Sequence, residues 1–514
     1  MIHVNVPKRK LIMPWEATLG NIFPSAPVLT LKGNKYVAID HGIDQVRFLR
    51  NIGYQAPAPI LHQYDWAGGT PFEIQKLTAA LLTTNYRAYV LNSFGTGKTK
   101  SALWAWHFLY MNGLAGKMLV IAPLSTLTFT WSVEVFKTLP NIKVQILHGS
   151  RERRLKRLSD PEASIFVINH DGLETIVGEL AKRPDIDTLC IDELAAYRNN
   201  SDRTKVVKKY AQPLKWVWGM TGSPTPNAPT DAWAQATVVT PQTVPKYFTH
   251  FRDQVMNRVT QFKYVPKHDA VQQVHRVLQP AVRFTLSDVI ELPDVVEREQ
   301  EVKMGTEQAR VYNEMAKFAR AKVSSGDIDA MNAGAILNKL LQISTGYVYK
   351  RDGTTVELDN DDRIDTMVDT VLAAENKVII FVPFKHALAG IIKALTRVGI
   401  EVAGVSGDTP KSARDAIFHE FQNDPNGLRV IAAHPATMAH GLTLTAADTI
   451  IWFGPTTSLE IFEQANARIR RVGQKAKQLV LMLWATKAER MMYQKLRAKQ
   501  KIQNALLELF EDES

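Results

Sequence analysis

The segment SFGTGKT at residues 93–99 has the residue types that hold a nucleoside triphosphate. Gly95 and Gly97 let backbone N–H groups turn toward phosphate oxygens, which a side chain with a Cβ atom would obstruct. Lys98 would then bridge the β- and γ-phosphates, and the Thr99 hydroxyl would bind Mg²⁺. The alternative is a glycine-rich turn with an unrelated lysine.

The surroundings of this segment favour a phosphate-binding loop. It follows an apolar run at 88–92 and precedes a helical pattern at 100–111, which is the strand–loop–helix order such loops need. Thr96 lies between the two glycines and is counted with the nucleotide-binding residues. The strict pattern has another glycine where this sequence has Asn92.

An acidic pair, Asp192 and Glu193, ends a second apolar run at 187–192. Ligand sites of parallel sheets lie at the carboxyl ends of the strands. Asp192 fits a Mg²⁺ ligand, and Glu193 fits a base for an attacking water. An isolated Asp-Glu pair is usually a surface feature, but its position downstream of a phosphate loop favours the catalytic interpretation.

Two series of short apolar runs, each followed by an amphipathic segment, are typical of buried parallel strands with crossover helices. The first comprises 88–92, 117–122, 143–147, 164–169, 187–192 and 215–220; the second comprises 377–382, 400–406, 428–433, 448–453 and 478–484. We therefore expect an α/β protein with two RecA-like, doubly wound parallel-sheet lobes in tandem.

The rest of the chain is expected to add helical insertions and a small α+β appendage. Residues 28–39 contain two strand-like runs around Gly33-Asn34, a two-residue hairpin signal. The expected domains are an N-terminal accessory domain (1–62), a first lobe (63–290), a helical insertion and hinge (291–360) and a second lobe (361–514).

Composition favours a folded protein with a polyanionic partner. Lys and Arg number 62 against 51 Asp and Glu, which gives a net charge of +11. The one cysteine, Cys190, excludes an intramolecular disulfide and fits a reducing compartment. We expect neither a signal peptide nor a membrane span, and a cytoplasmic protein of a bacterium or of a phage-infected host.

In sequence order, the motifs resemble those of superfamily two helicases, and within them the SWI/SNF-like branch of DNA translocases. The resemblance covers about residues 65–500, and its most discriminating part is the spacing of Gln, Arg, Arg, Gly and Gln in QANARIRRVGQ (464–474). The other motifs are PFEIQ (71–75), SFGTGKT (93–99), APLSTLTFTW (122–131), INHDGL (168–173), DELA (192–195), MTGSPTPN (220–227) and HGLTLTAAD (440–448).

This resemblance implies roles for further residues. It assigns Gln75 and Gln474 to ATP binding, with Gln75 at the adenine, and it assigns Arg468 and Arg471 to the γ-phosphate. Residues that would couple hydrolysis to lobe movement are Thr221, Ser223 and Gln464. Residues that would lie along the nucleic-acid backbone are Ser125, Thr126, His440, Gly441, Thr443 and Thr445.

Two positions depart from the family pattern. Ala195 replaces the usual His of the acidic motif, which puts coupling at that position in question but not hydrolysis. PATMAHG replaces the usual small, glycine-rich run before the HGLTLTAAD motif, so His440 could alter backbone contacts there.

The sequence therefore predicts an ATP- and Mg²⁺-dependent DNA translocase, acting as a monomer on duplex or branched DNA in replication, recombination or repair. One alternative is an RNA or single-strand helicase. Another is a nucleic-acid clamp or scaffold with an inactive ATP site, whose signature would be loss of Lys98, Asp192, Glu193 or Arg471. All four residues are present.

Two further sets of residues have competing interpretations. The basic segment RERRLKR (151–157) and the basic residues around 203–209 are either phosphate contacts or solvated helix faces. For the tryptophans at 104, 106, 131, 216 and 218, core packing is expected rather than stacking on bases.

Overall fold

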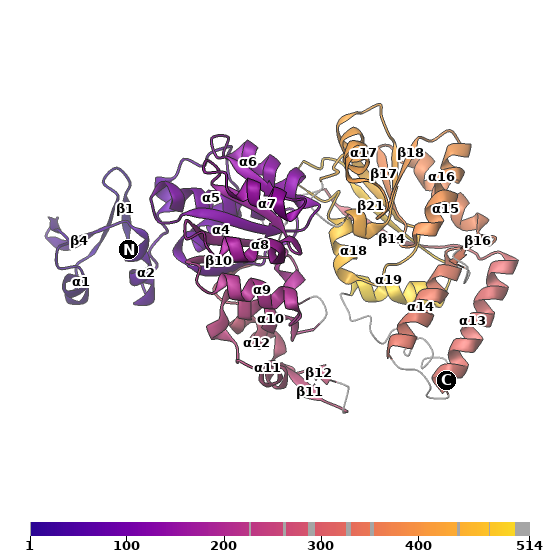
Figure 1. Ribbon diagram of the computed structural model, residues 1–514, viewed down its shortest axis with the longest axis horizontal. Helices are drawn as coiled ribbons and strands as arrows, with labels where there is room; N and C mark the ends of the chain where they lie inside the picture. Colours follow the sequence, from indigo (N-terminus) through magenta and orange to yellow (C-terminus); the bar gives the residue numbers. More distant parts are fainter. Residues whose placement is uncertain are drawn as a thin grey trace. The chain divides into compact units, whose positions relative to one another are not determined.

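A computed structural model describes residues 2–225, 228–260, 264–285, 293–324, 330–349, 354–438, 443–471 and 473–498. The chain divides into two compact units, Met1–Val289 and Ile290–Ser514 (Figure 1). Each unit is built around one parallel sheet flanked by helices, as the two series of apolar runs predicted.

The sheet of the first unit has seven parallel strands in the order β13-β5-β10-β9-β6-β8-β7. All six apolar runs of the first series form strands, so that prediction is confirmed. The strands are β5 (Arg87–Val90), β6 (Lys117–Ala122), β7 (Val144–Leu147), β8 (Ile165–Asn169), β9 (Ile186–Asp192), β10 (Trp216–Met220) and β13 (Ala281–Val282).

Alternate residues of these strands enter two separate apolar cores, because successive side chains of a strand point to opposite faces. In β6, Leu119 and Ile121 belong to one core and Met118 and Val120 to the other. The five tryptophans expected to pack inside are 0–1% exposed, which confirms that prediction. Cys190 is buried as well.

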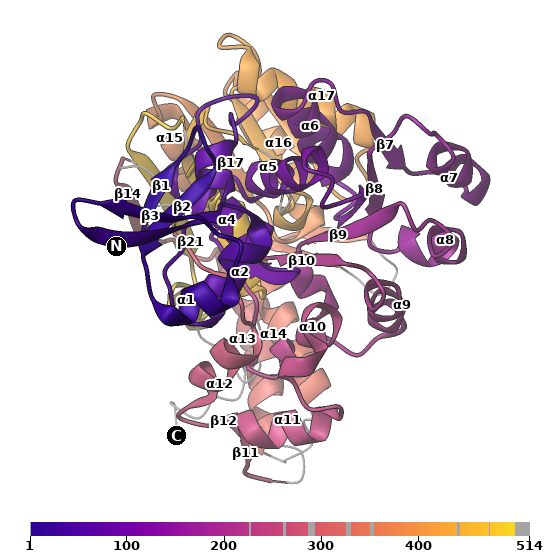
Figure 2. The same ribbon diagram turned by 90° about the vertical axis from the view of Figure 1, so that its left-hand side faces the viewer.

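Helices connect the strands and extend the first unit beyond the sheet. Those up to β10 are α4 (Glu73–Thr84), α5 (Lys98–Met111), the π-helix η1 (Leu127–Ser132), α6 (Val133–Thr138), α7 (Arg151–Leu158), α8 (Gly172–Leu180), η2 (Leu194–Tyr197) and α9 (Asp202–Ala211). Those after it are α10 (Asp231–Val239), η3 (Pro241–Thr243), α11 (Phe248–Val255) and α12 (Ala270–Val277), with a hairpin of β11 (Met256–Arg258) and β12 (Tyr264–Pro266) between the last two (Figure 2).

The N-terminal residues form a four-stranded antiparallel sheet with its own small core. The predicted hairpin is present, but Leu31 pairs with Asn34, so its two turn residues are Lys32 and Gly33, one residue earlier than expected. Both have the positive φ, 50° and 80°, that a type I′ turn needs. The elements are β1 (His3–Asn5), β2 (Lys10–Pro14), α1 (Ala17–Ile22), β3 (Val28–Leu31), β4 (Asn34–Asp40), α2 (Ile43–Asn51) and α3 (Ile60–Gln63).

Helix α2 joins this small sheet to the carboxyl end of α4. Arg47 donates to the Thr84 carbonyl at 2.9 Å, and Arg50 donates to the Thr84 hydroxyl at 3.0 Å. The Arg47 guanidinium also lies over the Tyr86 ring, 3.8 Å from its centroid. Cations that donate to the last carbonyl groups of a helix stabilise that end. Helix α2 therefore stabilises the carboxyl end of α4, the helix that carries Gln75 near its start.

The sheet of the second unit has six parallel strands in the order β14-β21-β20-β17-β19-β18. The five runs of the second series again form strands. The strands are β14 (Val295–Glu301), β17 (Lys377–Phe381), β18 (Val402–Val405), β19 (Val430–Ala433), β20 (Ala447–Trp452) and β21 (Gln478–Trp484).

Strand β14 lies within the range that was expected to be a helical insertion and hinge. Its sequence, VVEREQE, is mostly charged because it is an edge strand with little buried surface. Apolar periodicity therefore could not reveal it.

Helices cover this second sheet, and the two longest of them follow β14 in the chain. They are α13 (Thr306–Ser324), α14 (Ala330–Ser344), α15 (Asp361–Ala373), η5 (Lys385–Ala387), α16 (Leu388–Arg397), α17 (Lys411–Asn423), η6 (Pro435–Met438), α18 (Leu459–Asn466) and α19 (Lys487–Arg497), with a small hairpin of β15 (Tyr347–Tyr349) and β16 (Thr355–Glu357). In the described part of the chain, no helix combines the length and the apolar character needed to cross a bilayer.

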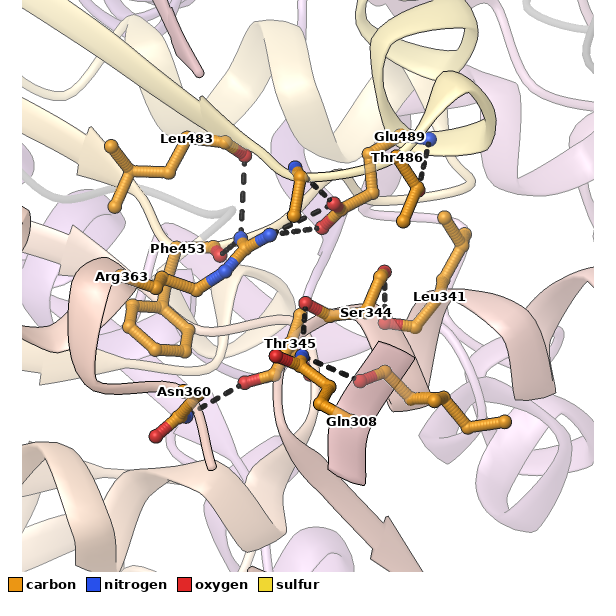
Figure 3. A network of polar contacts seen from close by, with 12 residues as sticks. Gln308, Leu341, Ser344, Thr345, Asn360, Arg363, Phe453, Leu483, Thr486 and Glu489 are labelled. Carbon is orange, nitrogen blue, oxygen red and sulfur yellow. Dashed lines mark hydrogen bonds and ion pairs between the residues drawn. The ribbon is translucent and has the colours of Figure 1, made fainter. Parts of the chain in front are cut away.

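A buried polar network ties α15 and α19 to the sheet (Figure 3). Arg363 on α15 is 1% exposed and donates to both carboxylate oxygens of Glu489 on α19, at 2.9 and 2.8 Å. Its other terminal nitrogen donates to the carbonyl of Phe453, which directly follows β20, and to the carbonyl of Leu483, which lies within β21. Burial of an ion pair is tolerated only with such complete hydrogen bonding. The network therefore specifies how these helices pack.

Candidate nucleotide and nucleic-acid site

The predicted motifs of the first unit gather at one edge of its sheet. The phosphate loop follows β5, Thr221 follows β10, Asp192 ends β9, and residues 123–126 follow β6. These four parallel strands are consecutive neighbours in the sheet. Their carboxyl ends therefore meet at the same edge, where α/β sheets bind ligands.

The phosphate loop has the backbone that its glycines were expected to allow. Gly95 and Gly97 have φ of 81° and 78°, in the left-handed region, and Gly97 is the N-cap of α5. A Cβ atom on Gly97 would lie 2.2 Å from the Gln75 amide nitrogen. The Lys98 ammonium donates to the carbonyls of Asn92 and Ser93 at 2.8 and 3.1 Å. The loop thus presents an anion-binding helix N-terminus with a lysine folded over it.

Gln75 joins the start of α4 to this loop. Its side-chain oxygen accepts from the Phe72 amide at 3.0 Å, and its amide nitrogen donates to the Thr96 carbonyl at 3.2 Å. The Thr96 hydroxyl donates to the Ser93 carbonyl at 2.9 Å. Gln75 therefore lies against the phosphate loop.

Asn92, the departure from the strict phosphate-loop pattern, has a structural explanation. Its side-chain amide donates to the Thr78 hydroxyl at 3.0 Å, and its side-chain oxygen accepts from the Phe284 backbone at 2.9 Å. The side chain is 2% exposed. Asn92 thereby links the first residue of the loop to α4 and to the strand segment that follows β13.

Asp192 and Glu193 are held by two different partners. The Trp131 indole donates to Asp192 Oδ2 at 2.9 Å, and the Thr221 hydroxyl donates to Glu193 Oε1 at 2.9 Å. Desolvation raises the pKa of the Asp192 carboxyl, whereas the Trp131 hydrogen bond and the charge of Lys98 act in the opposite direction.

Glu193 has a strained backbone that aims its side chain. Its φ of 59° places a non-glycine residue in the left-handed region, a conformation that costs about 1–3 kcal/mol and clusters at functional sites. Thr221, which contacts its carboxylate, is fully buried at the end of β10, and its hydroxyl also accepts from the Ser223 amide at 3.2 Å. Of the two predicted coupling residues of the first unit, Thr221 contacts the predicted base, and Ser223 contacts Thr221 through its backbone amide.

The residues present fit a Mg²⁺ ion shared with a nucleotide. Mg²⁺ typically takes one or two carboxylates and completes its ligand set with water and phosphate oxygens. Asp192 would supply the carboxylate and Thr99, at the start of α5, the hydroxyl. The ion would neutralise charge on the phosphates.

The first predicted nucleic-acid segment is a short turn between β6 and η1. The Thr126 backbone and hydroxyl both donate to the Pro123 carbonyl at 2.9 Å, and Thr126 is 4% exposed. Ser125 is partly exposed. The turn therefore offers Ser125 to a ligand more readily than the Thr126 hydroxyl.

In the second unit, the structure brings the HGLTLTAAD and QANARIRRVGQ motifs together. Arg471 donates to the Thr443 hydroxyl at 3.0 Å, and the Leu444 amide donates to the Arg468 carbonyl at 3.0 Å. Gln474 donates to the Ala447 carbonyl at 2.8 Å. These contacts join the two motifs, residues 440–448 and 464–474, into one largely buried cluster.

Several predicted residues of this cluster form hydrogen bonds within the second unit. The Gln474 oxygen accepts from the amides of Lys475 and Ala476, and Thr445 accepts from Gln422 at 3.2 Å. Arg468, 1% exposed, donates to the Gln464 carbonyl at 2.8 Å, and Gln464 donates to Glu460 at 3.2 Å. In this conformation the side chains of Arg468 and Gln464 bond to other residues of the same helical segment. Arg471 is more exposed than Arg468.

The remaining predicted residues either lie outside the described part of the chain or have other partners. His440 and Gly441 lie outside the described residues. In the basic segment on α7, Arg154 is buried and donates to the carbonyls of Leu147 and Gly149 at 2.9 Å each, so it is a packing residue rather than a phosphate contact. Arg203 on α9 pairs with Asp171.

Sequence reasoning missed the polar role of Trp131. It treated Trp131 as a core residue, and the ring is indeed fully buried, but its N–H reaches the acidic pair. The one available signal was the position of Trp131 inside the APLSTLTFTW motif.

The fold and this set of motifs define a two-lobe, phosphate-loop ATPase. A family model for the SNF2-related domain matches residues 67–348, and one for the helicase conserved C-terminal domain matches residues 362–473. The chain belongs to the SNF2-related family. It is a DNA-dependent ATPase of helicase superfamily two, as the resemblance in the motifs predicted.

Its relatives range from a compact phage protein to long chromatin proteins. "Putative protein p41" of Acyrthosiphon pisum secondary endosymbiont phage 1 is 28% identical over 421 residues, covering 78% of this chain and 88% of that one. "Transcription regulatory protein SNF2" of Saccharomyces cerevisiae is 24% identical over 452 residues, covering 82% of this chain but only 26% of the yeast protein. The solved "Sulfolobus solfataricus SWI2/SNF2 ATPase core in complex with dsDNA" is 21% identical, with a TM-score of 0.42, covering 84% of this chain and 92% of that one.

Lys98 gives the first testable prediction. Lys98→Ala should abolish ATP turnover and weaken ATP binding, because it removes the fixed positive charge over the phosphates. Steady-state turnover and binding of a fluorescent ATP analogue measure the two effects. Lys182→Ala, an exposed surface lysine of the same unit, is the matched control. Turnover like that of the unaltered protein would show that Lys98 is not the phosphate lysine.

Proposed function

We propose that this chain uses ATP hydrolysis to move along duplex DNA, with the ATP bound at the phosphate loop of the first unit. The observation that carries the proposal is the convergence of Lys98, the acidic pair and Thr221 at one sheet edge. Arg468 and Arg471 of the second unit are the residues that we propose for the γ-phosphate. Hydrolysis would then drive movement, because it changes which conformational state is favoured.

The proposed roles are those that the family resemblance implies for each residue. Gln75 contacts the adenine, and the loop residues 95–99 hold the phosphates. Asp192 and Thr99 hold Mg²⁺, and Glu193 accepts a proton from the attacking water. Thr221, which donates to Glu193, and Ser223 pass the state of the nucleotide to the rest of the unit.

For nucleic acid we propose contacts mainly with the phosphate backbone. The turn with Ser125 and Thr126, and the segment with His440, Gly441, Thr443 and Thr445, are the proposed contact sites. The net charge of +11 favours a polyanion. Phosphate contacts position a protein without reading sequence, as a translocase requires.

The finer biological role is proposed by analogy alone. By this analogy, a two-lobe ATPase fits an enzyme that remodels forks or junctions in replication, recombination or repair. We further propose that residues 1–62 form an accessory domain, since they have a core of their own and attach to α4 through Arg47 and Arg50.

The substrate proposal predicts that duplex DNA of any sequence stimulates ATP turnover. The affinity for DNA should fall steeply with salt, because binding to phosphates releases counterions. The measurement is steady-state turnover with duplex, single-stranded, forked and four-way junction DNA and with RNA, each over a range of salt concentrations. Stimulation by RNA or single strands but not by duplex would favour the alternative helicase. No stimulated turnover with any of them would favour the clamp.

A further inference from the structure

Trp131 is a buried tryptophan whose polar atom meets the proposed metal site. Its ring is 0% exposed and packs in the core that also contains Leu127 and Cys190. Its indole nitrogen donates to Asp192 Oδ2 at 2.9 Å. The indoles of Trp104, Trp106, Trp216 and Trp233 donate to main-chain carbonyls instead.

The backbone around Trp131 connects it directly to the proposed nucleic-acid turn. Thr126 is the N-cap of η1, and Trp131 is the fifth residue of that six-residue helix. The Val133 amide bonds to the Thr128 carbonyl, five residues back, which is the π-helical pattern. Such helices are rare and frequently lie at functional sites. The turn and the indole are thus two ends of one short element.

An indole N–H can only donate, so it can hold one carboxylate oxygen but cannot compete for a metal. By holding Oδ2 of Asp192, Trp131 sets the orientation of the carboxylate and the direction of its remaining lone pairs. Donors that orient a metal ligand in this way typically contribute about 10–100-fold to metal affinity or activity.

We infer that Trp131 is a positioning residue that makes metal binding at Asp192 respond to nucleic acid at residues 123–126. A shift of the turn on binding a phosphate backbone moves η1, and η1 carries the indole that orients Asp192. This inference rests on the proposed function, because it takes Asp192 as the Mg²⁺ ligand. It explains how DNA could stimulate hydrolysis from within the first unit.

The test is the affinity for Mn²⁺, a paramagnetic substitute for Mg²⁺, measured by electron paramagnetic resonance with a non-hydrolysable ATP analogue. In the unaltered protein, a 30-base-pair duplex should tighten Mn²⁺ binding. Trp131→Phe keeps the aromatic packing and removes the N–H. It should weaken Mn²⁺ binding about 10–100-fold and remove the effect of DNA.

Two controls separate this effect from a damaged core. Trp233→Phe removes an indole that donates to the Pro245 carbonyl at 2.8 Å, away from the acidic pair, and should leave Mn²⁺ binding unchanged. Incorporation of benzothienylalanine at position 131 keeps the size and shape of the ring without its donor. It should weaken Mn²⁺ binding and remove the effect of DNA even if the smaller Phe ring fails to support the fold.

The outcomes are distinguishable. Unchanged Mn²⁺ affinity with the isostere, a DNA effect that survives in it, or the absence of any DNA effect in the unaltered protein would each overturn the inference. Asp192→Asn tests the underlying metal site: if it binds Mn²⁺ like the unaltered protein, the proposed Mg²⁺ ligand is wrong, whatever Trp131 does.

Discussion

Glu193→Gln is expected to stop ATP hydrolysis while leaving ATP and DNA bound. Glutamine cannot accept the proton of the attacking water, and loss of a general base typically costs about 10²–10⁴-fold in rate. Its side-chain oxygen can still accept the hydrogen bond that Thr221 donates to Glu193 at 2.9 Å. The site should therefore keep its geometry and trap the nucleotide.

Single-turnover hydrolysis, nucleotide affinity and the dissociation rate of DNA measure these effects separately. Glu174→Gln, an exposed residue of α8, is the matched control and should behave like the unaltered protein. Near-normal hydrolysis in Glu193→Gln would place the base elsewhere. Loss of nucleotide affinity would show that the residue binds rather than activates.

Arg471→Ala is expected to lower turnover by orders of magnitude with ATP and DNA affinity within several-fold. An arginine finger places fixed positive charge where transition-state charge develops, and it contributes about 10³–10⁵ in rate. Arg471 contacts the Ala467 carbonyl and the Thr443 hydroxyl, and among the described residues no carboxylate pairs with it. Desolvation lowers the pKa of Arg471 to about 10, so its guanidinium stays charged at neutral pH, and we propose that this charge stabilises the γ-phosphate.

Arg471→Lys should restore little, because a point-charge ammonium lacks the planar fork of donors. Arg397→Ala, an exposed arginine of α16, controls for the loss of one positive charge in the same unit. A lower midpoint of thermal unfolding in Arg471→Ala, with normal turnover per folded molecule, would show a structural role instead.

The apolar runs predicted most of both sheets because strands buried on two faces are continuously hydrophobic. The same reasoning failed for β14, whose charged sequence reflects an edge position. It also placed the N-terminal turn one residue late, at Gly33-Asn34. The two turn residues with positive φ are Lys32 and Gly33. Local sequence does not show whether a strand has a neighbouring strand on one side or on both.

The sequence by itself indicated the candidate residues: the phosphate loop, the acidic pair and the arginines of the second unit are recognisable by type and spacing. It also determined the family, through the order of the motifs. Each of these signals is local, because a glycine-rich turn or an arginine pair can be recognised from a few residues of sequence.

Only the tertiary structure decided which of these residues meet. The order of β5, β10, β9 and β6 brings their carboxyl ends together, and no local pattern encodes the order of parallel strands. The hydrogen bonds from Trp131 to Asp192 and from Asn92 to Thr78 join residues 61 and 14 positions apart. Such contacts depend on how crossover helices and strands pack, because that packing alone sets the distance between residues remote in the chain.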